Sequence, residues 1–149
     1  MVIPLYIFPI LKYQAFASIE SEVISSLKDQ KLRGGSTALC NVLYNQKIYS
    51  ANLGDSQSIV IRGRDFISLS NLHDFSNELE RLSVEQKGGV LLKNRLEGEL
   101  AISRSIGDIN FKAFMSSEPD IFVYEITEAD DYLILATDGF WNVNRKIIE

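Results

Sequence analysis

Residues 132–141 read Tyr-Leu-Ile-Leu-Ala-Thr-Asp-Gly-Phe-Trp, an almost unbroken apolar run followed at once by a polar turn. The run 132–136 has the length of a strand, and its lack of polar alternation predicts a strand that is buried on both faces. A final helix is expected from Phe140 onward. This stretch therefore indicates a sheet in the interior of the protein and places Asp138 where the strand ends.

Short apolar and β-branched runs also precede this stretch. Three of them, at 36–43, 47–53 and 57–62, are separated only by Asn45-Gln46 and Gly54-Asp55-Ser56. This pattern is typical of an antiparallel meander whose strands are joined by hairpin turns. Further strands are expected at 90–92, 99–103 and 120–126.

Two segments have the spacing of helices. Residues 13–30 carry Phe16, Ile19, Val23 and Leu27 at intervals of three and four, which predicts a helix lying on a core and ending near Leu32. Residues 76–87 predict a surface helix, capped at its start by Ser76 or Asn77 and stopped by Gly88-Gly89. Strands interleaved with helices in this order predict an α+β layered fold with antiparallel sheets.

The first eleven residues are strongly apolar. They lack the basic residues of a signal peptide, Pro4 and Pro9 are expected to interrupt any helix, and the run is shorter than the roughly 20 apolar residues of a membrane span. We therefore interpret residues 1–11 as a buried strand or an atypical tail, and we expect no membrane association.

Length and composition limit the classes of function. The chain has 149 residues, 46% of them hydrophobic, which suits one soluble domain. Its formal charge is −5 and its basic residues are scattered, so no nucleic-acid partner is expected. A single cysteine, Cys40, and a single histidine, His73, cannot form a zinc site of several such ligands. The cysteine content favours an intracellular compartment, cytoplasmic or nuclear.

Two aspartates lie where predicted strands end. Asp138 could serve a hard cation such as magnesium or manganese, and Gly139 would let an ion approach the backbone. The alternative is that Asp138-Gly139 is only a turn. Asp55 lies at a predicted hairpin connection, where an Asp-Gly pair is commonly structural. His73 is expected to be a loop or packing histidine, because no nucleophile or metal partner accompanies it in the sequence.

Six motifs, in their order along the chain, resemble the metal-dependent protein serine/threonine phosphatases of the protein phosphatase 2C (PPM) family. They occupy about residues 33–143, and residues 1–12 stand outside them as the atypical tail of a single partial domain covering 1–149. The motifs are Gly35-Ser36-Thr37-Ala38, Ala51-Asn52-Leu53-Gly54-Asp55-Ser56, Glu80-Arg81 with Gly88-Gly89-Val90, residues 100–108 (Leu-Ala-Ile-Ser-Arg-Ser-Ile-Gly-Asp), Glu118-Pro119-Asp120, and residues 133–141.

The resemblance implies an α-β-β-α sandwich of two antiparallel sheets flanked by helices. It also implies hydrolysis of phosphoserine and phosphothreonine in a phosphoprotein substrate by water bound between two magnesium or manganese ions. By position, Asp138 matches the aspartate that ligates the metal pair, with Gly139 beside it. Asp55 matches an aspartate associated with a third metal. No residue is assigned a catalytic role beyond metal binding, and the substrate-binding residues are unknown.

Several family features are absent from this sequence. Residues 1–32 contain neither the phosphate-binding arginine region nor the Asp-Gly-His-Gly-Gly stretch, and the chain ends before the Asp-Asn strand, so we expect a sandwich incomplete at both ends. Asn142 replaces the usual aspartate, and Leu72 precedes His73 where many members read Asp-His. We therefore expect this polypeptide alone to be inactive and unable to hold the metal pair. The alternative is a pseudophosphatase that binds or scaffolds a protein partner.

Two further expectations follow from the same residues. Missing strands would leave unpaired sheet edges, which predicts that the isolated chain self-associates or needs a partner. A hydrolase with an N-terminal nucleophile, exposed by cleavage at Gly35 before Ser36 or Thr37, is a remote alternative, because it leaves the downstream motifs unexplained.

Overall fold

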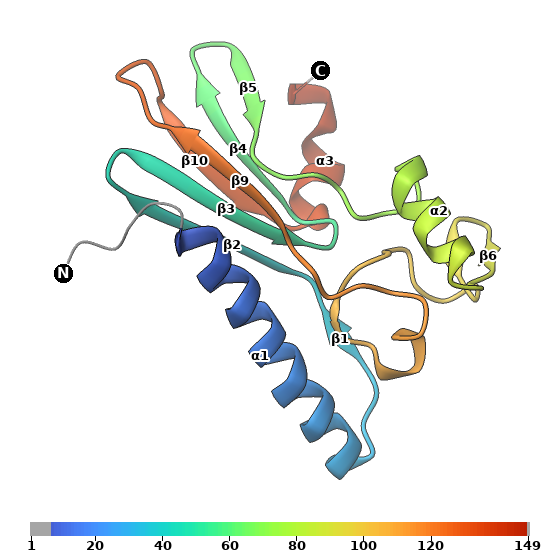
Figure 1. Ribbon diagram of the computed structural model, residues 1–149. Coiled ribbons are helices and arrows are strands. Elements are labelled where there is room, and N and C mark those ends of the chain that lie inside the picture. Colours follow the sequence, from blue (N-terminus) through green and yellow to red (C-terminus); the bar gives the residue numbers. More distant parts are fainter. Residues whose placement is uncertain (1–6, 149) are drawn as a thin grey trace.

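The protein is described here from a computed structural model, which covers residues 7–148 and the side chains of residues 13–143. Two antiparallel sheets pack face to face, with α1 (Ile7–Gln30) on the outer side of one and α3 (Asp138–Ile148) beside the other (Figure 1). Each of these two sheets has three strands. This arrangement confirms the α+β layered fold.

The strand bounds show how the chain is divided between the sheets. In hydrogen-bonded order, the first sheet contains β2 (Ala38–Tyr44), β3 (Lys47–Leu53) and β9 (Asp120–Glu125), and the second contains β10 (Tyr132–Ala136), β4 (Gln57–Arg62) and β5 (Asp65–Ser68). The bounds of β3, β4 and β10 agree with the predicted strands at both ends.

The predicted meander is wrong at its second connection. β2 and β3 form a hairpin, but β4 pairs with β5 and β10 and has no pairing with β3. Residues 54–56 therefore carry the chain from one sheet to the other. Gly54 makes this possible, because its φ of +105° lies in a region that side chains disfavour.

Alternating side chains on β3 fill two separate cores. Ala51 and Leu53 point to α1 and are buried against Phe16. Ile48, of the other parity, packs between the sheets with Val60 and Leu69. Because successive strand residues point to opposite faces, one strand supports both interfaces.

The first helix is longer than its spacing predicts. It begins at Ile7 rather than at residue 13, so the expected strand is wrong for residues 7–11, while residues 1–6 lie outside the described part. Pro9 does not break this helix, because it falls in the first turn, where backbone N–H groups have no intrahelical acceptor.

The end of the molecule beyond the sandwich is built from short elements, and we call it the short-element end. The helix α2 (Glu78–Gln86) begins after Asn77, whose side chain accepts a hydrogen bond from the backbone N–H of Leu79, as predicted for one of the two expected caps. A strand at 99–103 is not found. Instead β6 (Leu91–Leu92) pairs with β7 (Arg95–Leu96), since Lys93 and Asn94 both have positive φ and close a tight turn between them.

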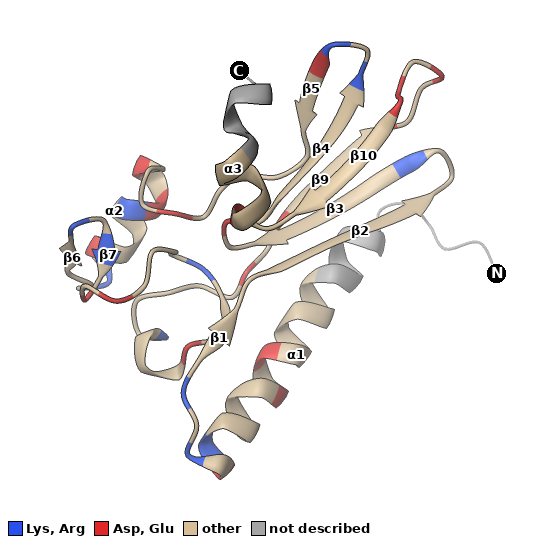
Figure 2. Ribbon diagram, turned by 180° about the vertical axis from the view of Figure 1, so that it is seen from behind, with Lys and Arg blue, Asp and Glu red and all other residues tan. Residues whose placement is uncertain are grey.

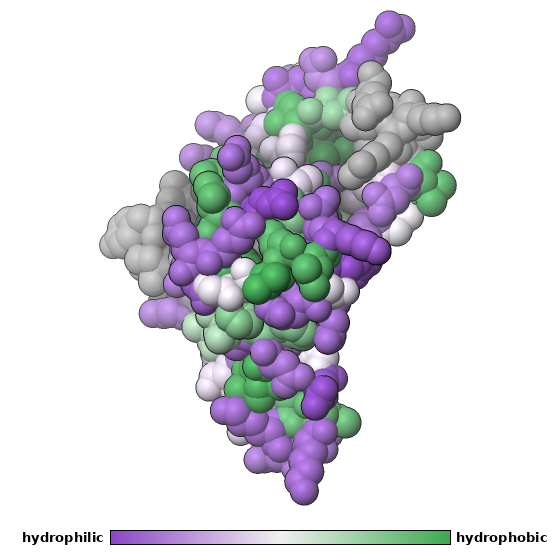
Figure 3. Space-filling view, turned by 90° about the vertical axis from the view of Figure 1, so that its right-hand side faces the viewer, coloured by the Kyte–Doolittle hydropathy of each residue, from purple (hydrophilic) through white to green (hydrophobic). Residues whose placement is uncertain are grey.

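The remaining elements tie this end to the sandwich. They are β1 (Gly35–Ser36), β8 (Ile106–Gly107) and a 3₁₀ turn, η1 (Ile109–Phe111). A third core of Phe75, Val84, Leu96 and Met115 holds α2 and β7 together. Figure 3 faces this end and shows hydrophobic side chains gathered near its middle. Exposed there are Leu79, Leu82, Val90 and Leu92.

The strand β10 is not buried on both faces. Tyr132 is 69% exposed and Leu135 is 42% exposed. Among the described residues β10 pairs only with β4, so it forms an edge of its sheet and its apolar side chains are incompletely covered. Within residues 7–148 no helix is both long and apolar enough to cross a lipid bilayer.

Candidate functional site

The pairing of β4 with β10 brings the two predicted aspartates to one end of the second sheet. Gln57, the first residue of β4, lies opposite Ala136, the last residue of β10. Asp55 precedes Gln57 by two residues and Asp138 follows Ala136 by two, so both extend beyond the same end of the strand pair. Figure 2 shows acidic segments at the start of α3 and in the neighbouring loop.

The negative charges of these two aspartates repel each other. Partial burial raises the pKa of Asp55, and the negative charge of Asp138 raises it further, with a smaller contribution from Asp74. Asp138 is exposed at the start of α3, not partly desolvated as its place after an apolar strand suggests. A divalent cation would relieve this repulsion, so the oxygen groups present fit magnesium or manganese.

Gly139 leaves the approach to this end open. A side chain added there would meet only Thr137 Oγ1, at 3.7 Å, among its surroundings. In the described part of the chain, however, no three His, Cys, Asp or Glu side chains gather closely enough to hold a metal ion. The metal-binding roles of Asp138, Gly139 and Asp55 therefore stay predictions. Asn142, the residue that replaces the usual aspartate, is exposed on α3.

The residues on both sides of Asp55 are firmly held. The backbone N–H of Gly54 donates to Nδ1 of His73 at 3.1 Å, and the side-chain amide of Asn52 donates to the Gly54 carbonyl at 3.1 Å. On the other side, the hydroxyls of Ser56 and Thr37 lie 3.2 Å apart in a hydrogen bond. The loop that carries Asp55 is thus fixed by polar contacts from Asn52 in the preceding strand and from two other segments, which carry His73 and Thr37.

His73 is fully buried, so the predicted packing role is confirmed, but its polar contacts were not foreseen. Its Nε2 lies 3.2 Å from Oδ2 of Asp120, although the ring N–H does not point well enough at that oxygen to form a hydrogen bond. Burial, followed by the nearby charge of Arg104, lowers the pKa of His73, which favours the neutral ring. A neutral ring with Nδ1 as acceptor carries its proton on Nε2.

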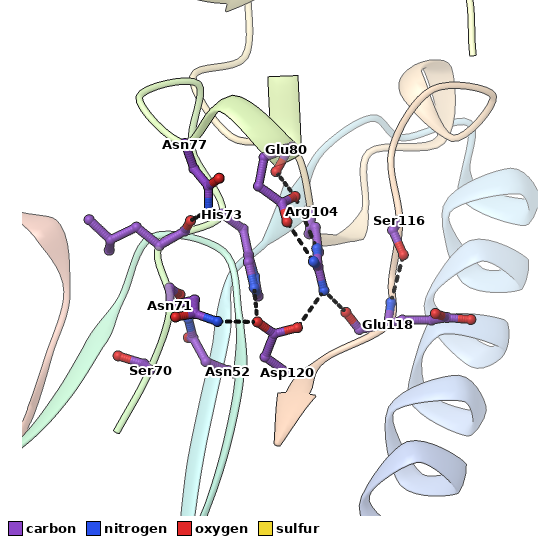
Figure 4. Close-up of polar contacts among 12 residues, drawn as sticks. Asn52, Ser70, Asn71, His73, Asn77, Glu80, Arg104, Ser116, Glu118 and Asp120 are labelled. Carbon is purple, nitrogen blue, oxygen red and sulfur yellow. Dashed lines mark hydrogen bonds and ion pairs between the residues drawn. The ribbon is translucent and has the colours of Figure 1, made fainter. Parts of the chain in front are cut away.

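Asp120 connects His73 to a larger polar network (Figure 4). Arg104 donates to Asp120 at 2.9 Å and to both carboxylate oxygens of Glu80, while Asn71 donates to Asp120 at 2.8 Å. The network joins the loop after β5, the helix α2, the segment before β8 and the first residue of β9. It therefore fixes the short-element end against the sandwich, close to the Asp55 loop.

The same network shifts the acidity of its members. Burial alone would raise the pKa of Glu80, but the hydrogen bonds from Arg104 and Ser103 outweigh it and the net shift is downward. Burial would likewise raise the pKa of Asp120, but the hydrogen bond from Asn71, the close approach of the His73 ring and the charge of Arg104 outweigh it, so its pKa is lowered. No sequence spacing predicts these pairs, because Glu80 and Arg104 are 24 residues apart. Their only signal is their presence in two of the quoted motifs.

Comparison with known proteins places these features in context. The family model described as Protein phosphatase 2C matches residues 10–146. The "Probable protein phosphatase 2C 55" of Oryza sativa subsp. japonica is 33% identical over 137 residues, which cover 89% of this chain and 36% of the relative. The "Protein phosphatase 2C homolog 1" of Saccharomyces cerevisiae is 42% identical over 100 residues, covering 67% of this chain and 36% of the relative.

Solved structures show the same architecture. A sex-determining protein of C. elegans superposes with a TM-score of 0.83 at 28% identity, covering 88% of this chain and 34% of the other. A serine-threonine phosphatase 2C from Toxoplasma gondii superposes with a TM-score of 0.78 at 24% identity, covering 96% of this chain and 56% of the other. The chain spans half or less of the length of several curated relatives that it matches, with shares of 36%, 50% and 25%.

Proposed function

The chain belongs to the protein phosphatase 2C family, and on that premise we propose that it forms part of a metal-dependent protein serine/threonine phosphatase domain. The substrate would be a phosphoserine or phosphothreonine in another protein. The observation that carries the proposal is the placement of Asp55 and Asp138 beyond one end of the β4–β10 pair, with mutually repelling carboxylates.

The residues of this chain would contribute oxygen ligands for magnesium or manganese. Asp138 and the open backbone at Gly139 would hold one part of the metal site, and Asp55 would hold another. When bound, such ions supply Lewis-acid stabilisation of phosphoryl oxygens and lower the pKa of a coordinated water. What the chain itself does is orient Asp55, through the contacts to Gly54 and Ser56, and present Asp138 at the start of a helix.

This polypeptide alone is proposed to lack phosphatase activity. Magnesium and manganese are held by about six oxygen ligands in near-octahedral geometry, and a pair of ions shares several carboxylates. Asp55 and Asp138 provide two carboxylates between them, which is too few to hold a pair against hydration. Activity would therefore require ligands from outside residues 1–149.

A pseudophosphatase that binds or scaffolds a protein partner is the second candidate. The observation that favours it is Asn142, whose amide keeps an oxygen but lacks the charge of the usual aspartate, and whose side chain is exposed on α3 near Asp138. The exposed apolar side chains of the short-element end offer a surface for a protein partner.

Phosphate release from a phosphothreonine peptide, measured with and without manganese, tests the proposal. The 149-residue chain should release no phosphate above background, whereas a longer polypeptide of the same protein, if the cell makes one, should show manganese-dependent release that Asp138→Asn abolishes. Manganese-dependent release by the short chain, abolished by Asp138→Asn, would contradict the proposed inactivity. A longer polypeptide with no release would favour the pseudophosphatase.

A further inference from the structure

Resting on the proposed function, we propose that His73 and Asn52 are positioning residues: they hold Gly54 so that Asp55 meets a divalent cation in a fixed orientation. Neither residue carries a charge toward the ion, and neither is one of the predicted ligands. Their effect on metal binding would pass through the backbone of Gly54.

The contacts to Gly54 hold both of the peptide bonds that flank it. Its N–H donates to His73 Nδ1 at 3.1 Å, and its carbonyl accepts from the backbone N–H of His73 and from the Asn52 amide, each at 3.1 Å. That carbonyl belongs to the peptide bond that joins Gly54 to Asp55. Fixing the plane of this peptide fixes the position of the Asp55 Cα, and so the point from which its side chain leaves the backbone.

The position tolerates little adjustment. Gly54 has φ of +105°, and a Cβ placed there would lie 2.3 Å from Thr37 Cγ2, so the backbone must approach Thr37 as glycine. With the N–H and the carbonyl of Gly54 both occupied, neither of the two peptide bonds that flank Gly54 can turn without breaking a buried hydrogen bond. The loop thus has one conformation in which all these groups are satisfied.

A space-filling role alone does not account for this geometry. His73 and Asn52 are both fully buried, yet each directs a polar atom at Gly54 rather than at solvent. Removing a hydrogen bond that orients a metal ligand commonly weakens metal binding by about 10–100-fold. A similar loss is expected here, because Asp55 is itself half-buried.

Two substitutions of His73 separate positioning from packing. The oxygen of His73→Asn lies near the place of Nδ1 and can still accept from the Gly54 N–H, whereas His73→Gln places its polar group near Nε2 and leaves that N–H without an acceptor. Both variants lose the ring and should destabilise the fold to a similar degree. Asn71→Ala is the matched control, since its side chain contacts Asp120 but not Gly54.

The experiment follows the whole chain by NMR. Hydrogen exchange of the Gly54 amide is measured without metal, and broadening of the Asp55 amide signal is then followed during titration with Mn²⁺ alone. We expect a protected Gly54 amide in the wild type, in His73→Asn and in Asn71→Ala. In His73→Gln that protection should be lost and the Mn²⁺ affinity should fall by about ten-fold or more.

The outcomes distinguish this inference from the proposed function. Equal Mn²⁺ affinity in the wild type and His73→Gln, or equal losses in His73→Asn and His73→Gln, would overturn the positioning role. An absence of Mn²⁺ broadening at Asp55 in the wild type would contradict the metal site of the proposed function. The positioning role toward that site would then be overturned as well, whether or not the Gly54 amide is protected from exchange. Should both His73 variants unfold, Asn52→Ala replaces them, with the same expected loss of Mn²⁺ affinity.

Discussion

Glu80 and Arg104 face each other as a two-point ion pair, with Arg104 Nε 3.0 Å from one carboxylate oxygen and Nη2 2.5 Å from the other. Glu80 lies on α2 and Arg104 lies in the segment before β8, so the pair joins two parts of the short-element end. Arg104 also reaches Asp120 on β9, which anchors that end to the sandwich. The Glu80 side chain is only 9% exposed and the Arg104 side chain 20% exposed.

Replacing Arg104 with alanine should lower the free energy of unfolding by about 3 kcal/mol, because it leaves the buried charge of Glu80 without its partner. Urea unfolding measures the change. Arg81→Ala is the control, since Arg81 forms a more exposed pair with Glu85 at 3.6 Å and its removal should cost less than about 0.5 kcal/mol. Equal effects of the two substitutions would show that the Glu80–Arg104 pair contributes no more than a surface pair.

Asp130 should contribute to loss of stability in acid. The backbone N–H of Thr127, together with Tyr124 and Arg62, lowers the pKa of Asp130 from 3.8 to about 2. A carboxyl whose pKa is lower in the folded state stabilises the fold above its unfolded pKa, and this contribution is lost as the pH falls from near 3.8 toward 2. Urea midpoints measured across this range should fall less steeply in Asp130→Asn than in the wild type.

Asp55→Asn should stabilise the metal-free chain at neutral pH while weakening its binding of Mn²⁺. The pKa of Asp55 is raised by burial and by Asp138, so folding at neutral pH opposes its ionisation. A raised pKa gives stability that is present in acid and lost as the pH rises through the folded value. The gain in melting temperature should therefore vanish at low pH, where Asp55 is protonated. A gain that persists in acid would point to a cause other than charge.

The sheet strands were the most predictable part of the fold. β3, β4 and β10 were located from β-branched and apolar runs bounded by turn residues. Their pairing was not predictable in the same way, because Gly54-Asp55-Ser56 has the composition of a hairpin turn but carries the chain to the other sheet. Local sequence does not distinguish these two connections, and the outcome depends on the buried contacts of Gly54 with His73 and Asn52.

The site was predictable only through the motifs. Asp55 and Asp138 were singled out from turns that are structural in most proteins, and the register Gln57–Ala136 supplies the reason for their proximity. The small contribution of Asp74 to the raised pKa of Asp55 was not predictable, because the two residues are far apart in the sequence. The role of Pro9 was also misjudged, since a proline in the first turn of a helix has a different consequence from one in its middle.

Two buried serines, Ser50 of β3 and Ser58 of β4, should respond in opposite ways to replacement by alanine. The hydroxyl of Ser50 is buried and has no hydrogen-bond partner among the described residues, so Ser50→Ala should stabilise the fold by about 1 kcal/mol. Ser58 Oγ, by contrast, accepts from the Asn41 amide at 2.6 Å, so Ser58→Ala should destabilise by about 1–3 kcal/mol. Thermal unfolding of both variants gives the two signs, and destabilisation by Ser50→Ala would reveal an unrecognised partner.

The open edge of β10 should make the isolated chain self-associate. In the described part of the protein β10 pairs on one side only, and Tyr132 and Leu135 leave apolar surface uncovered beside its unpaired backbone groups. Leu135 also lines an open pocket of about 320 Å³, together with Leu39 of β2. Unpaired strand backbone next to apolar side chains is a template for pairing with another chain.

Sedimentation velocity over a range of concentrations measures this association. The wild type should show a weight-average sedimentation coefficient that rises with concentration, and Leu135→Lys should reduce the rise, because charged side chains on an edge strand oppose pairing. Val143→Lys is the matched control: Val143 is 82% exposed and lies on α3 rather than on the edge strand, so its substitution should leave association unchanged. A wild-type chain that stays monomeric at all concentrations would contradict the prediction, since the edge would then be covered by other means.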